Sequence, residues 1–253
     1  MSTLNKNDKI IEVKHLSASF GSRKVLSDIS FKAYKGQITV ILGGSGSGKT
    51  TILKHLIGLY SIQEGSVSVM GVDLNTLDEK ELNQMYLKMG VFFQNGALLD
   101  SMTVRENIGL PLEQHSNLKT DYIDQLVELK LSLVNLANTS HLFPSELSGG
   151  MLKRAALARA IIMDPPLLFC DEPGAGLDPV SLASLDSLIQ NLKSQLGITV
   201  ILVTHIVSSI LRLADRVVFI SEGKVLLEDT LKQALASEQE EIKDFFNKGR
   251  GED

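Results

Sequence analysis

Short apolar runs alternate with longer stretches of helical periodicity along most of the chain. Three of these runs, Gln37–Leu42, Leu167–Cys170 and Ile198–Val203, consist mainly of branched and other apolar residues. A run of this length and composition predicts a strand that is buried on both faces, as in a parallel sheet. Alternation between Ile11 and Leu16, followed by Val25–Phe31, instead predicts a small antiparallel region near the N-terminus.

Helical signals follow the apolar runs. A helix is expected from Gly48 to about Leu59, and the pattern from about Gln94 to Ala160 predicts mostly helix. Within that segment, Thr103 begins a T-x-x-E capping box and therefore marks a helix start. A later helix begins after Asp178-Pro179, which is typical of an N-cap followed by proline at the first helical position, and stops at Gly197.

The C-terminal part of the chain predicts a hairpin and a closing helix. Val217–Ser221 and Lys224–Glu228 flank Glu222-Gly223, a dipeptide that suits a tight turn. Leu231–Asn247 has an apolar side and predicts one amphipathic helix.

Strands that alternate with helices imply a three-layer α/β core with a mainly parallel sheet. We expect one domain over residues 1–253, with the core at about 8–95 and 161–230. A helical subdomain at about 96–160 would separate the two halves of the core, and the C-terminal helix would occupy about 231–247.

The composition of the chain indicates its compartment and excludes some classes of partner. The chain has 253 residues, 43% of them hydrophobic, and a single cysteine, Cys170, so no disulfide can form within it and a reducing compartment is expected. The formal net charge of -5 argues against nucleic acid as a partner, because phosphate binding depends on surplus Lys and Arg. Met1–Ile10 is polar, unlike a signal peptide, and no apolar stretch approaches the roughly 20 residues that span a bilayer.

The strongest chemical motif is Gly43–Thr50 (GGSGSGKT), which matches the phosphate-binding pattern G-x-x-x-x-G-K-[ST]. Its context is right, since a buried strand precedes it and a helix follows. Glycines let successive backbone N–H groups point inward at phosphate oxygens, and the helix N-terminus adds its dipole. We expect Lys49 to reach the β- and γ-phosphates and Thr50 to ligate Mg²⁺.

A second motif is an apolar strand that ends in two acids, Asp171 and Glu172. Beside a P-loop, this Walker B pattern predicts that Asp171 holds Mg²⁺ and that Glu172 polarises the attacking water.

A third motif is Leu147–Met151 (LSGGM), which precedes a basic, alanine-rich helix. Its serine hydroxyl, glycine N–H groups and helix N-terminus would form another phosphate clasp.

Together these motifs resemble the ATPases of ABC transporters, with Met151 in place of the usual signature Gln. The fold implied is a RecA-like P-loop NTPase core with a helical signature subdomain. The resemblance also assigns Gln94 to the Q-loop, Ala175–Asp178 to the D-loop and His205 to the switch histidine that contacts the γ-phosphate. For the aromatic residue that stacks on adenine, Phe20 is the match, although Phe31 and Tyr34 lie nearby in sequence.

The resemblance therefore implies ATP and Mg²⁺ as ligands and three sets of residues. The catalytic residues would be Glu172, His205 and Lys49. The metal ligands would be Thr50, Gln94 and Asp171. The nucleotide-binding residues would be Phe20, Gly43, Gly44, Ser45, Gly46, Ser47, Gly48, Lys49, Thr50, Thr51, Gln94, Ser148, Gly149, Gly150 and Asp178.

Within this family, two subunits face head to tail, and Ser148–Gly150 of one would cover the ATP held by the other. Phe93–Ile108, LSGGM and Asp171–Pro179 resemble the ATPases of Mce/Mla-type lipid transporters in particular. That implies transmembrane permease subunits docking near Ala97–Pro111, an Mce-type lipid-binding protein, and a peripheral position on the cytoplasmic face of a bacterial inner membrane. The alternatives are the ATPase of an amino-acid or ion importer and a non-transport ABC protein.

Overall fold

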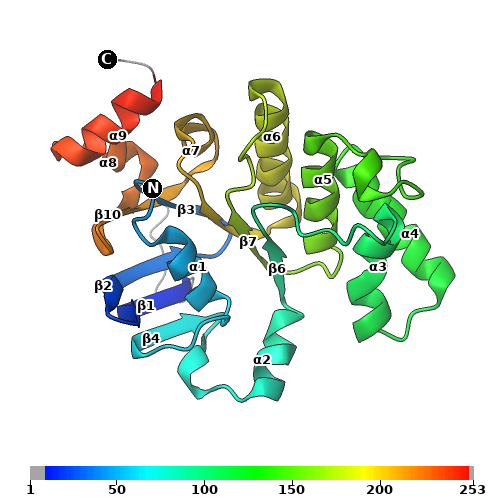
Figure 1. Ribbon diagram of the computed structural model, residues 1–253, viewed down its shortest axis with the longest axis horizontal. Helices are drawn as coiled ribbons and strands as arrows, with labels where there is room; N and C mark the ends of the chain where they lie inside the picture. The colour runs from blue at the N-terminus through cyan, green and yellow to red at the C-terminus, as the bar shows by residue number, and fades with distance from the viewer. Residues whose placement is uncertain (1–8, 251–253) are drawn as a thin grey trace.

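Two β-sheets and the helices that cover them make up residues 9–250, the part of the chain that the computed structural model describes. Residues 1–8 and 251–253, which belong to the expected domain and include most of its polar N-terminus, lie outside the described residues. Figure 1 shows the larger sheet at the centre, with α6 and α7 on one side and α1 and the smaller sheet on the other.

The larger sheet has six strands. In spatial order they are β10 (Lys224–Thr230), β9 (Arg216–Ser221), β3 (Ile38–Leu42), β8 (Thr199–Val203), β7 (Leu167–Asp171) and β6 (Met89–Phe92). All neighbours pair in parallel except β10, which forms an antiparallel hairpin with β9. Every residue of β3, β7 and β8 is buried, because helices or the second sheet cover both faces.

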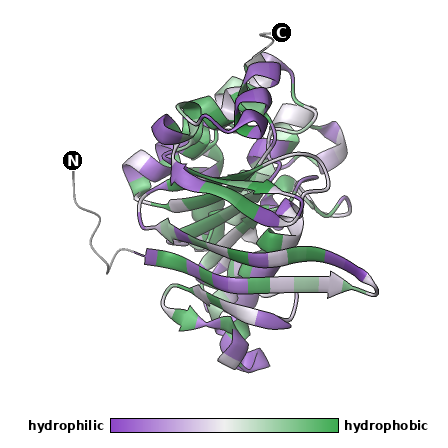
Figure 2. Cartoon of the chain, turned by 90° about the vertical axis from the view of Figure 1, so that its left-hand side faces the viewer, coloured by the Kyte–Doolittle hydropathy of each residue, from purple (hydrophilic) through white to green (hydrophobic). Residues whose placement is uncertain are grey.

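The smaller sheet is antiparallel throughout. Its order is β2 (Arg23–Tyr34), β1 (Lys9–Phe20), β4 (Glu64–Val69) and β5 (Val72–Asp73). The predicted antiparallel region is therefore confirmed, but β1 and β2 are longer than the alternating segments suggested. Figure 2 shows these two long strands below the larger sheet, whose strands are mostly hydrophobic.

Helices fill the remaining layers. They are α1 (Lys49–Leu56), α2 (Glu79–Tyr86), α3 (Val104–His115), α4 (Thr120–Leu133), α5 (Gly149–Ala160), α6 (Pro179–Leu196), α7 (Val207–Leu213), α8 (Leu231–Leu235) and α9 (Glu240–Arg250). Short 3-10 turns occur at Leu74–Thr76 and Pro144–Glu146. As predicted, Thr103 and Glu106 form a capping box at the start of α3, and α6 runs from the N-cap Asp178 to Gly197.

Two apolar cores lie on opposite faces of the six-stranded sheet. One joins the sheet to the helices from α3 onward, including Phe92, Val127 and Phe219. The other joins it to α1 and the antiparallel sheet, including Phe31, Ile52 and Phe169. The expected three-layer α/β architecture with a mainly parallel sheet is therefore the one observed.

The C-terminal helix differs from its prediction. The expected single helix over 231–247 is two helices, α8 and α9, with a break between Leu235 and Glu240. Within the break the Ser237 hydroxyl accepts a hydrogen bond from the backbone N–H of Gln239, and this local bond competes with helix continuation. The break lets α9 turn, so that its Ile242 and Phe246 are buried against the core.

Candidate functional site

The P-loop joins the end of β3 to the start of α1. Two of its glycines are required by their conformation: Gly43 has φ 145° and Gly48 has φ 106°. A Cβ on Gly43 would lie 2.0 Å from the backbone oxygen of Ile220, and one on Gly48 would lie 2.7 Å from Leu26 Cδ2. These close approaches, together with the left-handed φ values, explain why the turn needs glycine at both positions.

Lys49 lies under this loop. Its Nζ donates hydrogen bonds to the carbonyl oxygens of Gly43 (3.0 Å) and Gly44 (2.7 Å), and its side chain is buried. Burial lowers the pKa of Lys49, while Glu172 and Asp171 oppose that shift. The ammonium group is thus held at the loop by two carbonyls that phosphate oxygens could replace.

The two acids of the Walker B pattern end β7, next to the P-loop. Asp171 Oδ1 accepts a hydrogen bond from the Thr50 hydroxyl (3.2 Å), which brings two of the predicted metal ligands together. Burial raises the pKa of Asp171, and the nearby Glu172 adds to this, whereas Thr50, Lys54 and Lys49 oppose it. A carboxylate and a hydroxyl are oxygen ligands of the kind that Mg²⁺ prefers.

Glu172 follows in a left-handed conformation with φ 45°. Its backbone N–H donates to the Val203 oxygen (2.9 Å), which extends the β7–β8 pairing by one residue. Its side-chain Oε1 lies 2.8 Å from Nδ1 of His205, which follows β8 on the neighbouring strand. Positive φ costs a non-glycine residue free energy, and the surrounding structure must hold Glu172 in this conformation.

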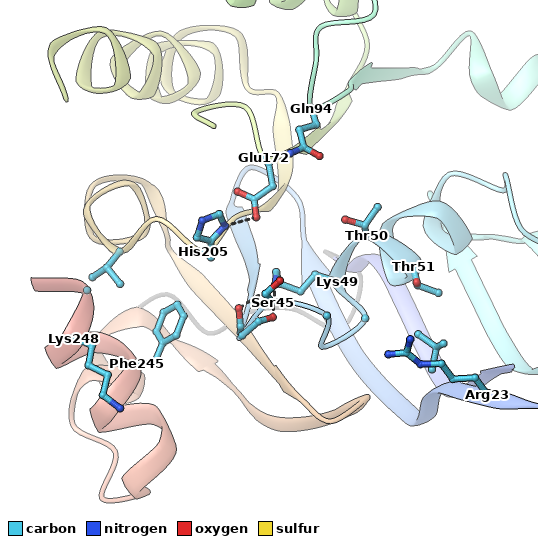
Figure 3. A pocket seen from close by; sticks show the side chains of 17 residues that line it. Arg23, Ser45, Lys49, Thr50, Thr51, Gln94, Glu172, His205, Phe245 and Lys248 are labelled. Carbon is cyan, nitrogen blue, oxygen red and sulfur yellow. Dashed lines mark hydrogen bonds and ion pairs between the residues drawn. The ribbon is translucent and has the colours of Figure 1, made fainter. Parts of the chain in front are cut away.

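A cleft of about 820 Å³ collects most of the predicted residues (Figure 3). The predicted residues that line it are Gly43, Gly44, Ser45, Gly46, Gly48, Lys49, Thr50, Thr51, Gln94, Glu172 and His205. They come from the carboxyl ends of adjacent parallel strands, which is where open α/β sheets place their ligands.

Ser47 and Asp171 are buried beside this cleft rather than in its lining. The Ser47 hydroxyl oxygen is buried and has no hydrogen-bond partner within residues 9–250. Glycine N–H groups, an ammonium, and the Thr50–Asp171 pair match the phosphates of a nucleotide with its divalent cation.

The remaining predicted residues lie elsewhere. Ser148 is the N-cap of α5, and it and Gly149 are exposed at the end of that helix, outside the cleft lining. Asp178 is exposed and caps α6, where its Oδ1 accepts from the N–H groups of Val180 and Ser181. In one chain, therefore, the signature and D-loop residues do not meet the P-loop.

Phe20 is also outside the cleft lining. It is exposed at the end of β1 and packs edge-to-face on Tyr60, with ring centroids 5.3 Å apart. The two alternatives are engaged elsewhere, since Phe31 is buried in the core and Tyr34 lies under the guanidinium of Arg216. Phe20 thus remains the exposed aromatic residue among the three.

Sequence reasoning missed part of the cleft wall. Arg23 and Val25 from β2 line it on one side. Val207 of α7 and Phe245 and Lys248 of α9 line it on the other, as Figure 3 shows for α9. No motif marks these residues, and α9, which follows the break after α8, contributes two of them.

The Q-loop is held by the helix that carries the signature residues. Lys153 Nζ donates to the backbone oxygen of Gln94, and Arg159 donates to the oxygens of Gly96 and Ala97, both at 2.7 Å. The Gln94 side chain itself remains exposed at the cleft. Helix α5 and the segment after β6 are therefore tied through backbone carbonyls.

Within residues 9–250, none of the helices combines the length and the apolar content needed to cross a lipid bilayer.

Comparison with known proteins agrees with this geometry. A family profile described as "ABC transporter" matches residues 26–175. The "Intermembrane phospholipid transport system ATP-binding protein MlaF" of Haemophilus influenzae is 40% identical over 95% of this chain and 91% of its own length. The "Probable ribonucleotide transport ATP-binding protein mkl" of Mycobacterium leprae is 39% identical over 94% of this chain and 68% of its own.

Solved structures show the same fold. An ATP-binding cassette, MJ0796, solved as a dimer in a post-hydrolysis state bound to ADP and Pi, superposes with a TM-score of 0.80. It is 28% identical and covers 87% of this chain and 98% of its own. The transporter component cbiO1 from Clostridium perfringens gives a TM-score of 0.83 at 27% identity, over 95% of both chains. By these matches and by the P-loop cleft, this chain belongs to the ABC transporter family as an ATP-binding subunit that hydrolyses ATP.

Proposed function

We propose that two copies of this chain, facing head to tail, bind and hydrolyse two Mg²⁺-ATP to drive phospholipid transport through a separate permease. The observation that carries the dimer is the separation of the two phosphate clasps. The P-loop, Gln94, Glu172 and His205 share one cleft, whereas Ser148–Gly150 lie at the α5 N-terminus, outside its lining, with Ser148 and Gly149 exposed and Gly150 half-buried. An exposed helix N-terminus with a serine cap suits a phosphate that another chain supplies.

Within each site, the loop N–H groups and Lys49 would bind the β- and γ-phosphates. Thr50, Asp171 and Gln94 would hold Mg²⁺, which neutralises charge on the phosphate oxygens. Phe20 would stack on adenine, and Thr51 and Ser47 would add hydroxyl groups at the phosphates. Asp178, across the dimer interface in this arrangement, would lie near the partner's site.

Glu172 would orient the attacking water and accept its proton while the water oxygen bonds to the γ-phosphorus and the bond to the ADP oxygen breaks. His205 is already 2.8 Å from the carboxylate, and its side chain is 62% exposed toward the cleft. From there the imidazole could turn from Glu172 toward a γ-phosphate oxygen.

The substrate class rests on the relatives. The Haemophilus influenzae relative is named for phospholipid transport, and the chain matches it nearly end to end. The segment Ala97–Pro111, which includes the exposed Leu99, would receive a cytoplasmic helix of the permease. We infer a peripheral position on the cytoplasmic face of the inner membrane and an Mce-type lipid-binding partner. The mycobacterial relatives keep ribonucleotides as a second candidate cargo.

The chemistry is tested by Glu172→Gln. This change keeps the size of the side chain and removes its basicity, so ATP should still bind while turnover falls by about a hundredfold or more. Steady-state ATPase assays and size-exclusion chromatography with ATP would show loss of turnover and a trapped dimer. Turnover near the wild-type rate would refute the assignment of the base.

The split site is tested by Ser148→Arg. Because Ser148 lies outside its own chain's cleft, nucleotide binding to the monomer should be unchanged, while hydrolysis should stop. Fluorescent-nucleotide titration measures the first and phosphate release the second. Loss of binding in the monomer would contradict the head-to-tail arrangement.

The substrate class is tested by co-purification of the tagged chain with its membrane partners. Recovery of a permease with an Mce protein would support lipid transport, and recovery of a permease for another cargo would contradict it.

A further inference from the structure

Thr204 is the last residue before His205, at the carboxyl end of β8. It is only 2% exposed, and its hydroxyl donates a hydrogen bond to Oε2 of Glu172 at 3.1 Å. Glu172 therefore has a donor on each oxygen: Thr204 on Oε2 and the His205 ring on Oε1. Thr204 belongs to none of the sequence motifs described above.

The direction of the threonine proton follows from its second hydrogen bond. The backbone N–H of Ile206 donates to Thr204 Oγ1 at 3.1 Å. A hydroxyl has one proton to give, and an ionised carboxylate can only accept. With one lone pair of Oγ1 already used by Ile206, the proton points at Glu172.

Both residues are also fixed through the backbone. The Thr204 N–H donates to the Ile41 oxygen (3.3 Å), and the Glu172 N–H donates to the Val203 oxygen (2.9 Å). The hydroxyl and the carboxylate therefore stand on neighbouring strands of the rigid central sheet. Side chains that are supported in this way are best able to hold a reacting group in one orientation.

The two donors differ in their freedom to move. The His205 side chain is 62% exposed, whereas Thr204 is almost completely buried. If the imidazole turns from Glu172 toward a γ-phosphate, the Thr204 hydroxyl is the donor that stays on the carboxylate. We propose that Thr204 is a positioning residue for ATP hydrolysis, holding Oε2 of Glu172 so that Oε1 faces the cleft. This inference rests on the roles proposed above for Glu172 and His205.

The variant Thr204→Val tests it, because valine keeps the shape and removes the hydroxyl. Loss of a hydrogen bond to a charged group should lower kcat by about ten- to a hundredfold. The KM for ATP should change by less than about twofold, since the hydroxyl lies behind Glu172 and not among the residues lining the cleft. Thr204→Ser keeps the donor and should restore kcat to within about threefold of wild type.

The matched control is Thr39→Val on the adjacent strand β3. Thr39 is also fully buried, but its hydroxyl has no hydrogen-bond partner within residues 9–250. That substitution should leave kcat unchanged and should not lower the melting temperature. A general effect of placing valine in the sheet would instead lower kcat in both variants.

Three results would overturn the proposal: a wild-type kcat in Thr204→Val, a serine variant as slow as the valine variant, or a KM that rises in step with the loss of kcat. Glu172→Gln, measured in parallel, separates this failure from failure of the proposed function. A slow Glu172→Gln with a normal Thr204→Val removes only the inference about Thr204. A fast Glu172→Gln removes the role of Glu172 itself.

Discussion

The two glycines that open the P-loop should respond very differently to alanine. Gly43 has φ 145°, and a Cβ there would lie 2.0 Å from the backbone oxygen of Ile220 on β9. Gly44, its neighbour, has no positive φ, and a Cβ there would meet nothing within 4 Å. We therefore expect Gly43→Ala to destabilise the nucleotide-free protein strongly and Gly44→Ala to leave its stability nearly unchanged.

The size of the effect follows from two costs. Holding alanine in a backbone region that is nearly exclusive to glycine costs about 1–3 kcal/mol. Relieving the clash requires a shift of the P-loop or of β9, because the obstacle is backbone, and such overpacking costs about 1–3 kcal/mol more. At about 2–4 °C per kcal/mol for a chain of this length, Gly43→Ala should melt about 4–24 °C below wild type.

The assay is thermal unfolding without nucleotide, followed by circular dichroism at one scan rate for wild type and both variants. Gly44→Ala should melt within about 4 °C of wild type, since alanine there mainly lowers the entropy of the unfolded chain. A melting temperature for Gly43→Ala within about 2 °C of wild type would refute the reasoning. Equal decreases in the melting temperatures of the two variants would refute it as well. They would mean that the effect of a Cβ in this loop depends neither on the φ of the glycine nor on its contacts.

Two further outcomes are expected. Phe20→Ala should raise the KM for ATP about tenfold, because the stacking of the ring on adenine is lost. Phe20→Tyr keeps an aromatic ring and should have a KM close to that of wild type in the same steady-state assay. An unchanged KM in the alanine variant would show that Phe20 does not bind adenine. Asp186 is buried under Arg212 and Ser209, and burial raises its pKa despite both partners. The folded protein thus binds this proton more tightly than the unfolded chain, so its contribution to stability is largest below about pH 4 and falls as pH rises through the raised pKa. The melting temperature of wild type minus that of Asp186→Asn should therefore decrease as the pH rises from about 4 through the raised pKa of Asp186. A difference in melting temperature that does not depend on pH would contradict the raised pKa.

Local structure could be predicted from the sequence wherever the interacting groups lie within a few residues of one another. The capping box of Thr103 and Glu106 and the Asp178 cap of α6 formed as predicted, because each bond spans three residues or fewer. Apolar runs such as Ile198–Val203 became buried parallel strands for a similar reason, since composition alone marks a segment with no polar face. Helices α2 and α7 were missed, and both are short.

By itself, then, the sequence predicted the α/β core and most of its strands, located the P-loop and Walker B motifs, and indicated the family to which the chain belongs. Only the tertiary structure decided which residues meet. Glu172 contacts His205 and Thr204 because β7 and β8 end side by side, although more than thirty residues separate them in the chain. The same packing brings α9 to the cleft, leaves Ser148 outside it, and buries Phe31 while exposing Phe20. These outcomes depend on contacts between distant segments that compete for the same buried surface, and no local pattern records which contact prevails.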